Sequence, residues 1–306
     1  MKLVSFRRKG ELRIGSLVGN KIADLRAASA ARGGPDLPGD MVEFLEMGAR
    51  GLRAARAAER FATRFPEAML PRNRVRLEAP VPCPRKLLAL AGNYTSHLQE
   101  EGRRARTKRE QNPRVFMKPP STTVNRPGGT IPLTKYSRWV DWEVELGIVI
   151  GRRARDITVR EAPRHIVGYT IVNDISEREF CVRRRTTTED FDRFFDWLNG
   201  KWPDGFAPMG PCITTADEIG DPMNLAIRLA VNGKTMQDAN TSGMVFSCYE
   251  IVSYISRWVT LEPGDVIATG TPAGVGKVRG IKLKDGDVVR AEIEKIGVLV
   301  NKVARR

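Results

Sequence analysis

The sequence has no hydrophobic run that could cross a membrane. No stretch approaches the roughly 18 consecutive apolar residues that a spanning helix needs. The opening segment MKLVSFRRKGEL also lacks the apolar core of a secretory signal. We therefore expect a cytoplasmic protein that does not enter a membrane.

Cysteine is scarce, and its spacing carries no motif. The 306 residues include four cysteines that lie far apart, and none belongs to a CxxC pair. This pattern predicts reduced, mostly buried thiols in place of a disulfide framework. The four are Cys83, Cys181, Cys212 and Cys248.

Acidic residues are too few to balance the basic ones. Lysine and arginine number 51 against 36 aspartates and glutamates, which gives a net charge of +15. The basic residues are spread along the chain, with local runs at 102–110 and 181–185, and no helix-turn-helix, zinc finger or aromatic-interleaved RNA motif accompanies them. We therefore expect no nucleic-acid partner. A positive field of this kind favours small anionic substrates.

The chain divides into two predicted domains. Residues 1–75 begin with alternating apolar and polar residues that predict a small antiparallel meander, and a helical segment follows from about Asp40, a plausible N-cap, to Phe65. Three prolines at 78–86 mark a linker. Residues 76–306 then show more strands than helices, without a βαβα rhythm. We predict an α+β, mainly β fold with a mixed and largely antiparallel sheet architecture.

Two further elements are predicted in the second domain. Asn232-Gly233 is a strong two-residue hairpin turn. Residues 243–261 have apolar residues at helical spacing, and the EPGD sequence after them ends the predicted helix.

The segment VDWEVELGIVIG at 140–151 places three acids at the entrance of an apolar strand. Alternation along a strand predicts that Asp141, Glu143 and Glu145 share one face, with Glu143 and Glu145 about 6–7 Å apart. Unpaired, partly buried charges at that distance repel by roughly 2–3 kcal/mol at an effective dielectric near 20. Arginines or lysines could neutralise them, and a hard divalent cation could do so better. Asp174, at the end of the strand in GYTIVND, is the candidate third ligand, although it could simply cap the next turn.

A histidine and a glutamate lie together in AGNYTSHLQE at 91–100. Ser96 and Gln99 match a capping box, which predicts a helix whose first turn carries His97 and Glu100 on one face. A carboxylate beside an imidazole is a general-base arrangement, and it is also a common pair on a helix surface. The other histidine, His165, lies in the loop-like segment APRH.

Two glycine-rich loops complete the candidate site. The loop at 199–211 carries Lys201, and the loop at 268–276 offers backbone amides and the hydroxyl of Thr271. The second loop is not a P-loop, because Val278 replaces the required hydroxyl. It could hold a small anion or be a structural turn.

Seven stretches of the chain, in this order, resemble the fumarylacetoacetate hydrolase family over roughly residues 83–303. They are GNYTSHLQE, FMKPP, DWEVELGIVIG, GYTIVND, GKWPDGFAPMGP, VNG and PGDVIATGTPAGVG. The resemblance implies a mixed β-sandwich roll behind a small N-terminal domain, and a homodimer. It also implies that Glu143, Glu145 and Asp174 bind Mg²⁺ or Mn²⁺.

The resemblance also assigns roles to other side chains. His97 and Glu100 correspond to a water-activating dyad on a lid segment, and Lys201 corresponds to the lysine that stabilises developing negative charge. The implied substrate-binding residues are Tyr94, Lys118, Arg178, Gly270 and Thr271. The chain departs from many relatives at Cys181, where they carry glutamine, and in its longer 183–199 segment. Both changes lie where the tail of a substrate would bind.

The expected activity is metal-dependent hydrolysis of a C–C bond in an acylpyruvate or related β-diketo acid, giving pyruvate and a carboxylic acid. The metal would act as a Lewis acid on the 2-keto acid end, and Glu100 with His97 would activate water. The same metal site could serve a decarboxylase of oxaloacetate-like acids, an isomerase of a 2-hydroxy dioate from aromatic catabolism, or a hydratase of sugar-derived 2-keto acids.

Overall fold

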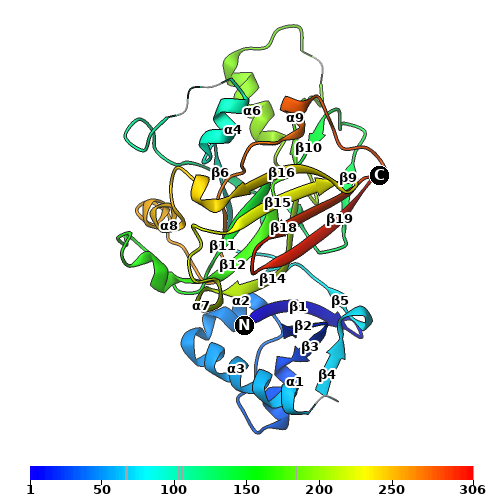
Figure 1. The fold of residues 1–306 in the computed structure, drawn as a ribbon, viewed down its shortest axis with the longest axis vertical. Coiled ribbons are helices and arrows are strands. Elements are labelled where there is room, and N and C mark those ends of the chain that lie inside the picture. The colour runs from blue at the N-terminus through cyan, green and yellow to red at the C-terminus, as the bar shows by residue number, and fades with distance from the viewer. Residues whose placement is uncertain (66–67, 103, 105, 184, 306) are drawn as a thin grey trace.

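A computed structural model describes residues 1–65, 68–102, 104, 106–183 and 185–305 (Figure 1). Its main feature is a large mixed sheet that runs from one end of the molecule to the other. In spatial order its strands are β4 (Met69–Pro71), β3 (Lys21–Asp24), β2 (Glu11–Val18), β1 (Lys2–Arg8), β14 (Ala207–Thr215), β12 (Ile166–Asn173), β11 (Val144–Ile150), β17 (Val266–Ala268), β6 (Leu87–Ala91) and β7 (Arg114–Lys118). Two short strands join its side, β5 (Arg76–Leu77) on β1 and β8 (Val124–Asn125) on β14.

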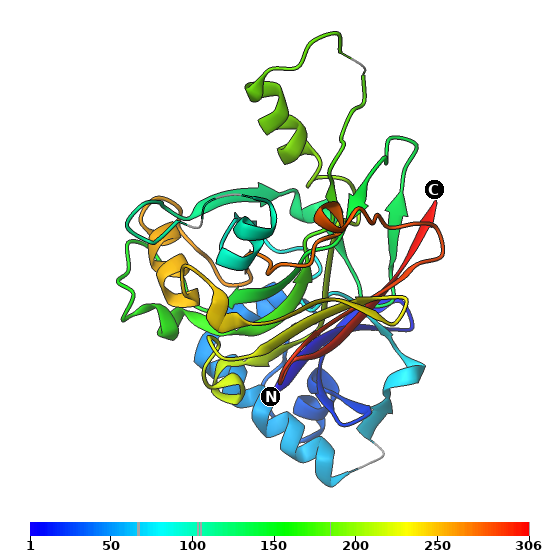
Figure 2. The ribbon, with the colours of Figure 1, turned by 45° about the horizontal axis from the view of Figure 1, so that its top comes forward.

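A second sheet lies beside the first (Figures 1 and 2). Its order is β16 (Lys234–Asn240), β15 (Ala226–Val231), β18 (Val288–Ile293), β19 (Gly297–Arg305) and β9 (Thr130–Leu133). A two-stranded ladder of β10 (Val140–Asp141) and β13 (Ser176–Glu177) stands beside them. Most neighbouring strands are antiparallel, and the parallel pairs include β17 with β6 and β19 with β9. The predicted mixed, mainly β fold is therefore confirmed.

Helices and short 3₁₀ turns connect the strands of the sheets. The helices are α1 (Leu25–Ala31), α2 (Met41–Glu46), α3 (Gly48–Arg64), α4 (Thr95–Glu100), α5 (Pro120–Thr123), α6 (Asp190–Asn199), α7 (Ala216–Ile219), α8 (Cys248–Ser256) and α9 (Gly276–Arg279), with short 3₁₀ turns at η2 (Arg72–Arg74), η3 (Ala162–His165) and η4 (Thr241–Gly243). The segment that carries α6 projects away from the body at the top of Figure 2. None of the helices in the described part of the chain has both the length and the apolar character that a membrane crossing requires.

The N-terminal residues form the predicted meander of β1, β2 and β3. Asp40 caps α2 by accepting the backbone N–H groups of Val42 and Glu43. The predicted helix over Asp40 to Phe65 is divided in two, because Gly48 adopts a left-handed φ of 56° between α2 and α3.

The meander is continuous with the rest of the protein. Strand β1 pairs with β14, with Leu3 opposite Ile213. The apolar residues of α2 and α3 belong to the same core cluster as Leu87, Val149 and Val266 of the large sheet. The domain boundary predicted near residue 75 thus lies inside one sheet and beside one shared core, and the division into two domains stays a prediction.

The predicted second domain forms the expected hairpin and a shorter version of the expected helix. The Asn232-Gly233 turn joins β15 to β16, and both residues have positive φ, at 51° and 81°. The helix predicted over 243–261 is shorter, because the capping box of Ser247 with Glu250 starts α8 at Cys248. All four cysteines are free; Cys212 and Cys248 are buried, whereas Cys83 is exposed and Cys181 is half-buried.

Candidate active site

The acid-rich segment does not form one continuous strand. Strand β10 ends at Asp141 and β11 begins at Val144, so the ladder is interrupted at Trp142, whose indole N–H donates to the carbonyl of Gly274. The carboxylate of Asp141 accepts N–H groups from Gly276 (2.6 Å) and Lys277 (3.0 Å). The alternation nevertheless persists across this gap, since Val140, Trp142 and Val144 belong to one core cluster. Asp141 stays on the side of the glutamates, where Arg178 contacts both it and Glu143. The carboxylate of Asp141 holds the second glycine-rich loop in place.

The other two acids converge with Asp174. Glu143 precedes β11, Glu145 lies within it, and Asp174 follows β12, which pairs with β11. The N–H of Asp174 donates to the carbonyl of Glu143 at 2.8 Å, which fixes the ends of the two strands together. All three side chains are buried, and one carboxylate oxygen from each lies within 4.8 Å of the others. The structure thus brings together the three predicted ligands.

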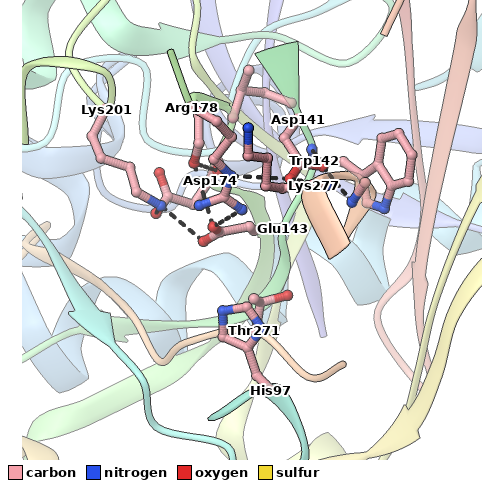
Figure 3. Close-up of polar contacts among 12 residues, drawn as sticks. His97, Asp141, Trp142, Glu143, Asp174, Arg178, Lys201, Thr271 and Lys277 are labelled. Carbon is pink, nitrogen blue, oxygen red and sulfur yellow. Dashed lines mark hydrogen bonds and ion pairs between the residues drawn. The ribbon is translucent and has the colours of Figure 1, made fainter. Parts of the chain in front are cut away.

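Two lysines contact this acidic triad of Glu143, Glu145 and Asp174. Lys201 donates to Glu143 at 2.8 Å and to Asp174 at 2.7 Å (Figure 3). Lys118 is fully buried on β7 and donates to Asp174 and to the carbonyl of Ile175. Burial lowers the pKa of Lys118, whereas the charges of Asp174 and Glu143 outweigh burial at Lys201 and raise its pKa.

Arg178 links Glu143 to the loop. Its guanidinium lies 2.5 Å from Glu143 and 3.0 Å from Asp141 (Figure 3). Although burial favours the protonated form of Glu143, the charges of Lys201 and Arg178 prevail and hold its pKa below the usual range. Glu143 is therefore an anion in the folded protein.

Glu145 is the member of the triad with an unsatisfied oxygen. One oxygen accepts the N–H of Gly270 at 2.6 Å, and the other is buried with no hydrogen-bond partner among the described residues. Burial raises the pKa of Glu145, and the nearby charges of Asp174 and Glu143 raise it further. A divalent cation would contact the unpaired oxygen of Glu145, and its positive charge would offset the negative charges of the three carboxylates. Three carboxylates are the oxygen donors that Mg²⁺, Mn²⁺ or Ca²⁺ prefer, so these residues fit such an ion.

The predicted pair on α4 is formed. His97 Nδ1 lies 2.8 Å from one oxygen of Glu100, and the other oxygen of Glu100 accepts the N–H of Gly274 at 2.7 Å. Helix α4 is therefore tied to the glycine-rich loop through Glu100. His97 Nε2 lies 3.8 Å from Glu101, an acid that the motif analysis missed although its position four residues after His97 places it on the same helix face.

The predicted capping box at Ser96 and Gln99 is wrong. Helix α4 begins one residue earlier, at Thr95, with Tyr94 as its N-cap and no side-chain cap. The hydroxyl of Ser96 accepts the N–H of Ala273 instead. The contact with the loop across the site thus competes with the local cap.

A cavity of about 570 Å³ connects α4 with the acidic triad. Its walls combine cationic and aromatic side chains with His97, Glu143 and Thr271, from elements that are distant in the sequence. The described lining residues are Leu90, Ala91, Gly92, His97, Leu98, Glu101, Arg114, Val115, Phe116, Glu143, Arg178, Arg193, Phe194, Trp197, Lys201, Thr271 and Lys277. The cavity therefore presents positive charge next to a buried acidic centre.

Three of the residues assigned to substrate binding lie behind this wall. Tyr94, Lys118 and Gly270 are absent from the described lining; Tyr94 and Lys118 are buried, and the Gly270 N–H is used by Glu145. Thr271 does line the cavity, but its hydroxyl donates to the carbonyl of Val144. The same hydroxyl accepts a hydrogen bond from the amide nitrogen of Gln237, a residue the motif analysis did not identify.

Comparisons with known proteins identify similar chains. Residues 86–304 match the family described as fumarylacetoacetate hydrolase C-terminal. A mitochondrial oxaloacetate tautomerase of Bos taurus is 41% identical over 287 residues, which are 93% of this chain and 84% of the relative. Maleylpyruvate hydrolase from Sphingobium, solved in complex with manganese(II) ion and pyruvate, has a TM-score of 0.77 at 30% identity, covering 100% of this chain and 99% of that one. A 2-hydroxyhepta-2,4-diene-1,7-dioate isomerase from Mycobacterium marinum has a TM-score of 0.72 at 30% identity, with coverage of 100% and 99%.

Proposed function

The chain belongs to the fumarylacetoacetate hydrolase family, and we propose that within it the chain is a divalent-metal-dependent tautomerase that interconverts the keto and enol forms of a small 2-oxo dicarboxylate such as oxaloacetate. One observation carries the proposal: His97, Glu143 and Lys201 line a single cavity. A proton-carrying group thus faces an acidic centre that fits a cation. The choice among family reactions is supported by the bovine relative, which is named an oxaloacetate tautomerase and aligns over 93% of this chain.

The acidic triad defines where the 2-oxo acid end of the substrate would lie. A divalent cation held by Glu143, Glu145 and Asp174 would supply Lewis acidity, which makes the C–H next to the oxo group easier to ionise. Lys201 and Arg178 place two fixed positive charges beside the same centre. They would stabilise the negative charge that develops when that C–H loses its proton.

His97 is the group placed to move the proton. Its Nδ1 is engaged by Glu100, so Nε2 is the nitrogen that can accept a proton from the substrate carbon. In the keto-to-enol direction Nε2 would take the proton from C3 and return one to the oxygen at C2; the reverse order regenerates the keto form. No bond to water is formed or broken, which suits a reaction that only relocates a proton.

The cationic walls fit a dicarboxylate. Arg114, Arg193 and Lys277 line the cavity in addition to the residues at the acidic centre. These cationic side chains would attract the second carboxylate of the substrate in whichever direction the substrate lies in the cavity. Phe116 and Trp197 pack edge to face beside them, with ring centroids 5.1 Å apart, and would exclude water from the apolar part of the substrate.

C–C hydrolysis of an acylpyruvate is the second candidate. It is favoured by Glu100, whose carboxylate could act with His97 as a general base toward a water molecule, and by the resemblance to maleylpyruvate hydrolase. The two reactions share the enolate of the 2-oxo acid. They differ in whether water attacks.

The test follows oxaloacetate and a panel of acylpyruvates by proton NMR, with Mg²⁺ or Mn²⁺ and with an EDTA control. We expect the rate of keto–enol exchange of oxaloacetate to rise with enzyme and metal and to fall in EDTA. If an acylpyruvate instead releases pyruvate and a carboxylic acid, and the exchange of oxaloacetate is not accelerated, the tautomerase proposal is rejected in favour of the hydrolase. Metal-dependent CO₂ release from oxaloacetate would point to decarboxylation.

A further inference from the structure

A second cavity of about 570 Å³ lies outside the active site, near the C-terminal strand. It is bordered by the loop that follows β9, by β10 and by the segment before β18, and β9 lies beside the C-terminus in Figure 1. The described lining residues are Leu133, Thr134, Lys135, Ser137, Arg138, Val140, Lys282, Leu283, Lys284, Asp285 and Arg305. We call this the basic cavity.

Positive charge dominates the lining of the basic cavity. Five of its side chains are cationic and one is anionic, which leaves a net charge of +4 (five minus one). All five cationic residues are exposed, and none of them forms an ion pair with a carboxylate in the part of the chain that the structure describes. In the N-terminal part of the protein, by contrast, arginines such as Arg13, Arg26 and Arg56 do pair with acids. The repulsion among the five charges would be relieved by an anion.

The acids near the basic cavity are already engaged with the backbone. Asp285 accepts the N–H of Arg305 at 2.8 Å, and Asp287 accepts the N–H of Lys284 at 2.7 Å. These two hydrogen bonds position the backbone at Lys284 and Arg305 and leave the charges of their side chains unpaired. The backbone N–H of Leu283 donates to the carbonyl of Val140 at 2.9 Å, which ties this segment to β10.

We propose that the basic cavity binds a small multivalent oxyanion with the size and charge of pyrophosphate or a tricarboxylate. Arginine presents paired N–H donors that match phosphate and carboxylate oxygens, and lysine adds point charges that tolerate either geometry. A cavity with a net charge of +4 matches an anion of three or four negative charges better than a single carboxylate. The proposal does not depend on the reaction at the acidic triad.

Trp139 contacts one lysine of the basic cavity and one lysine of the active-site cavity. Lys277 of the active-site cavity and Lys282 of the basic cavity both place their ammonium groups over the ring of Trp139, at 4.5 and 5.6 Å from its centroid. The backbone carbonyl of Trp139 accepts the N–H of Arg178, whose side chain contacts Glu143. Trp139 and Arg178 thus form a chain of contacts from Lys282 to the acidic centre.

Isothermal titration calorimetry tests the proposal at about 50 mM NaCl, where screening is weak. Inorganic pyrophosphate and citrate are titrated separately into the wild-type protein and two double variants without added divalent salt. Lys282→Glu with Lys284→Glu reverses two charges of the basic cavity. Lys21→Glu with Lys234→Glu makes the same change in charge at two exposed strand lysines outside it. Circular dichroism checks that all three proteins are folded.

We expect one site in the wild-type protein, a dissociation constant raised at least about tenfold by the cavity reversal, and little change with the control reversal. Binding of pyrophosphate alone, or of citrate alone, identifies the source of the oxyanion. Three results would overturn the proposal. The first is that the wild type binds neither anion at millimolar concentration. The second is binding that survives the cavity reversal, because the anion then occupies the active site, and the third is equal weakening by both double variants, which indicates non-specific attraction to a basic surface.

Discussion

The ammonium of Lys201 contacts two carboxylates of the acidic triad at once, at 2.8 Å from Glu143 and 2.7 Å from Asp174. The third carboxylate, Glu145, contacts no lysine among the described residues and is held by the N–H of Gly270. The triad is therefore asymmetric. Two carboxylates contact a lysine ammonium, whereas Glu145 has no such partner in the described part of the chain and can contact a bound cation.

Replacing Lys201 by methionine should make the fold depend on metal. The change leaves two buried carboxylates without their shared cation, so we expect a loss on the order of 3 kcal/mol in the free energy of unfolding in EDTA. Saturating Mn²⁺ should recover much of this loss, since binding to the folded state stabilises it. Thermal unfolding with and without Mn²⁺ measures both effects. Lys234→Met, at an exposed strand position, is the control, and an equal loss with and without metal would contradict the prediction.

Glu145→Gln should weaken metal binding while leaving the metal-free protein at least as stable. Glutamine can still accept the N–H of Gly270, and the change removes a charge that Asp174 and Glu143 repel. We expect an affinity for Mn²⁺ at least about tenfold lower, measured by calorimetry, and loss of metal-dependent turnover. Glu43→Gln on α2 is the matched control. Wild-type affinity in Glu145→Gln would remove this residue from the ligand set.

His97→Asn and Glu100→Gln should reduce kcat without changing metal affinity. General acid–base groups contribute about 10²–10⁴-fold to turnover, so losses in that range are expected for His97→Asn. Because Glu100 acts through His97 Nδ1, the double variant should be little worse than His97→Asn alone. Steady-state kinetics on oxaloacetate or an acylpyruvate, with calorimetry for the metal, give both readouts. Multiplicative losses would show that Glu100 acts independently of His97, as a base toward water would.

Thiol reactivity should separate the cysteines by burial. Burial raises the pKa of Cys248 to about 12, so its thiol stays protonated at pH 8 and reacts slowly with a disulfide reagent. Cys212 is buried as well, and burial raises its pKa. We expect rapid modification of the exposed Cys83 in the native protein, with Cys212 and Cys248 reacting only after unfolding. Peptide mapping after a short exposure identifies the modified residues; early labelling of Cys248 would contradict the assigned burial.

The sequence alone located the acidic triad because its members end neighbouring strands. Glu143 and Glu145 lie at the entrance of an apolar run, and Asp174 closes the next strand, so antiparallel pairing brings them together. Alternation holds across the gap at Trp142, since Val140, Trp142 and Val144 belong to one core cluster. The hydrogen bond of Asp141 with the loop at Gly276 was not predicted, because no local pattern encodes a contact between such distant segments.

Other features depended on contacts between distant segments. The capping box at Ser96 has the right residues, yet its hydroxyl contacts Ala273 of the loop across the site. The basic cavity brings Lys135 and Arg138 next to Lys282 and Arg305, which lie more than a hundred residues later in the chain, so no single run of charge marks it. Local patterns thus predicted strands, hairpins and the N-cap at Asp40, whereas long-range packing decided which side chains face each cavity.

The pairing of β1 with β14 sets an order of events during synthesis. Leu3 leaves the ribosome early, but its partner Ile213 follows about 210 residues later, or about 10–40 s at ordinary elongation rates. Strand β5 can cover Phe6 and Arg7 of that edge early, but Lys2 and Leu3 stay open until β14 is made, and an open strand edge can pair with other chains. Slow translation before residue 215 would therefore lengthen the exposure of this part of β1 to aggregation.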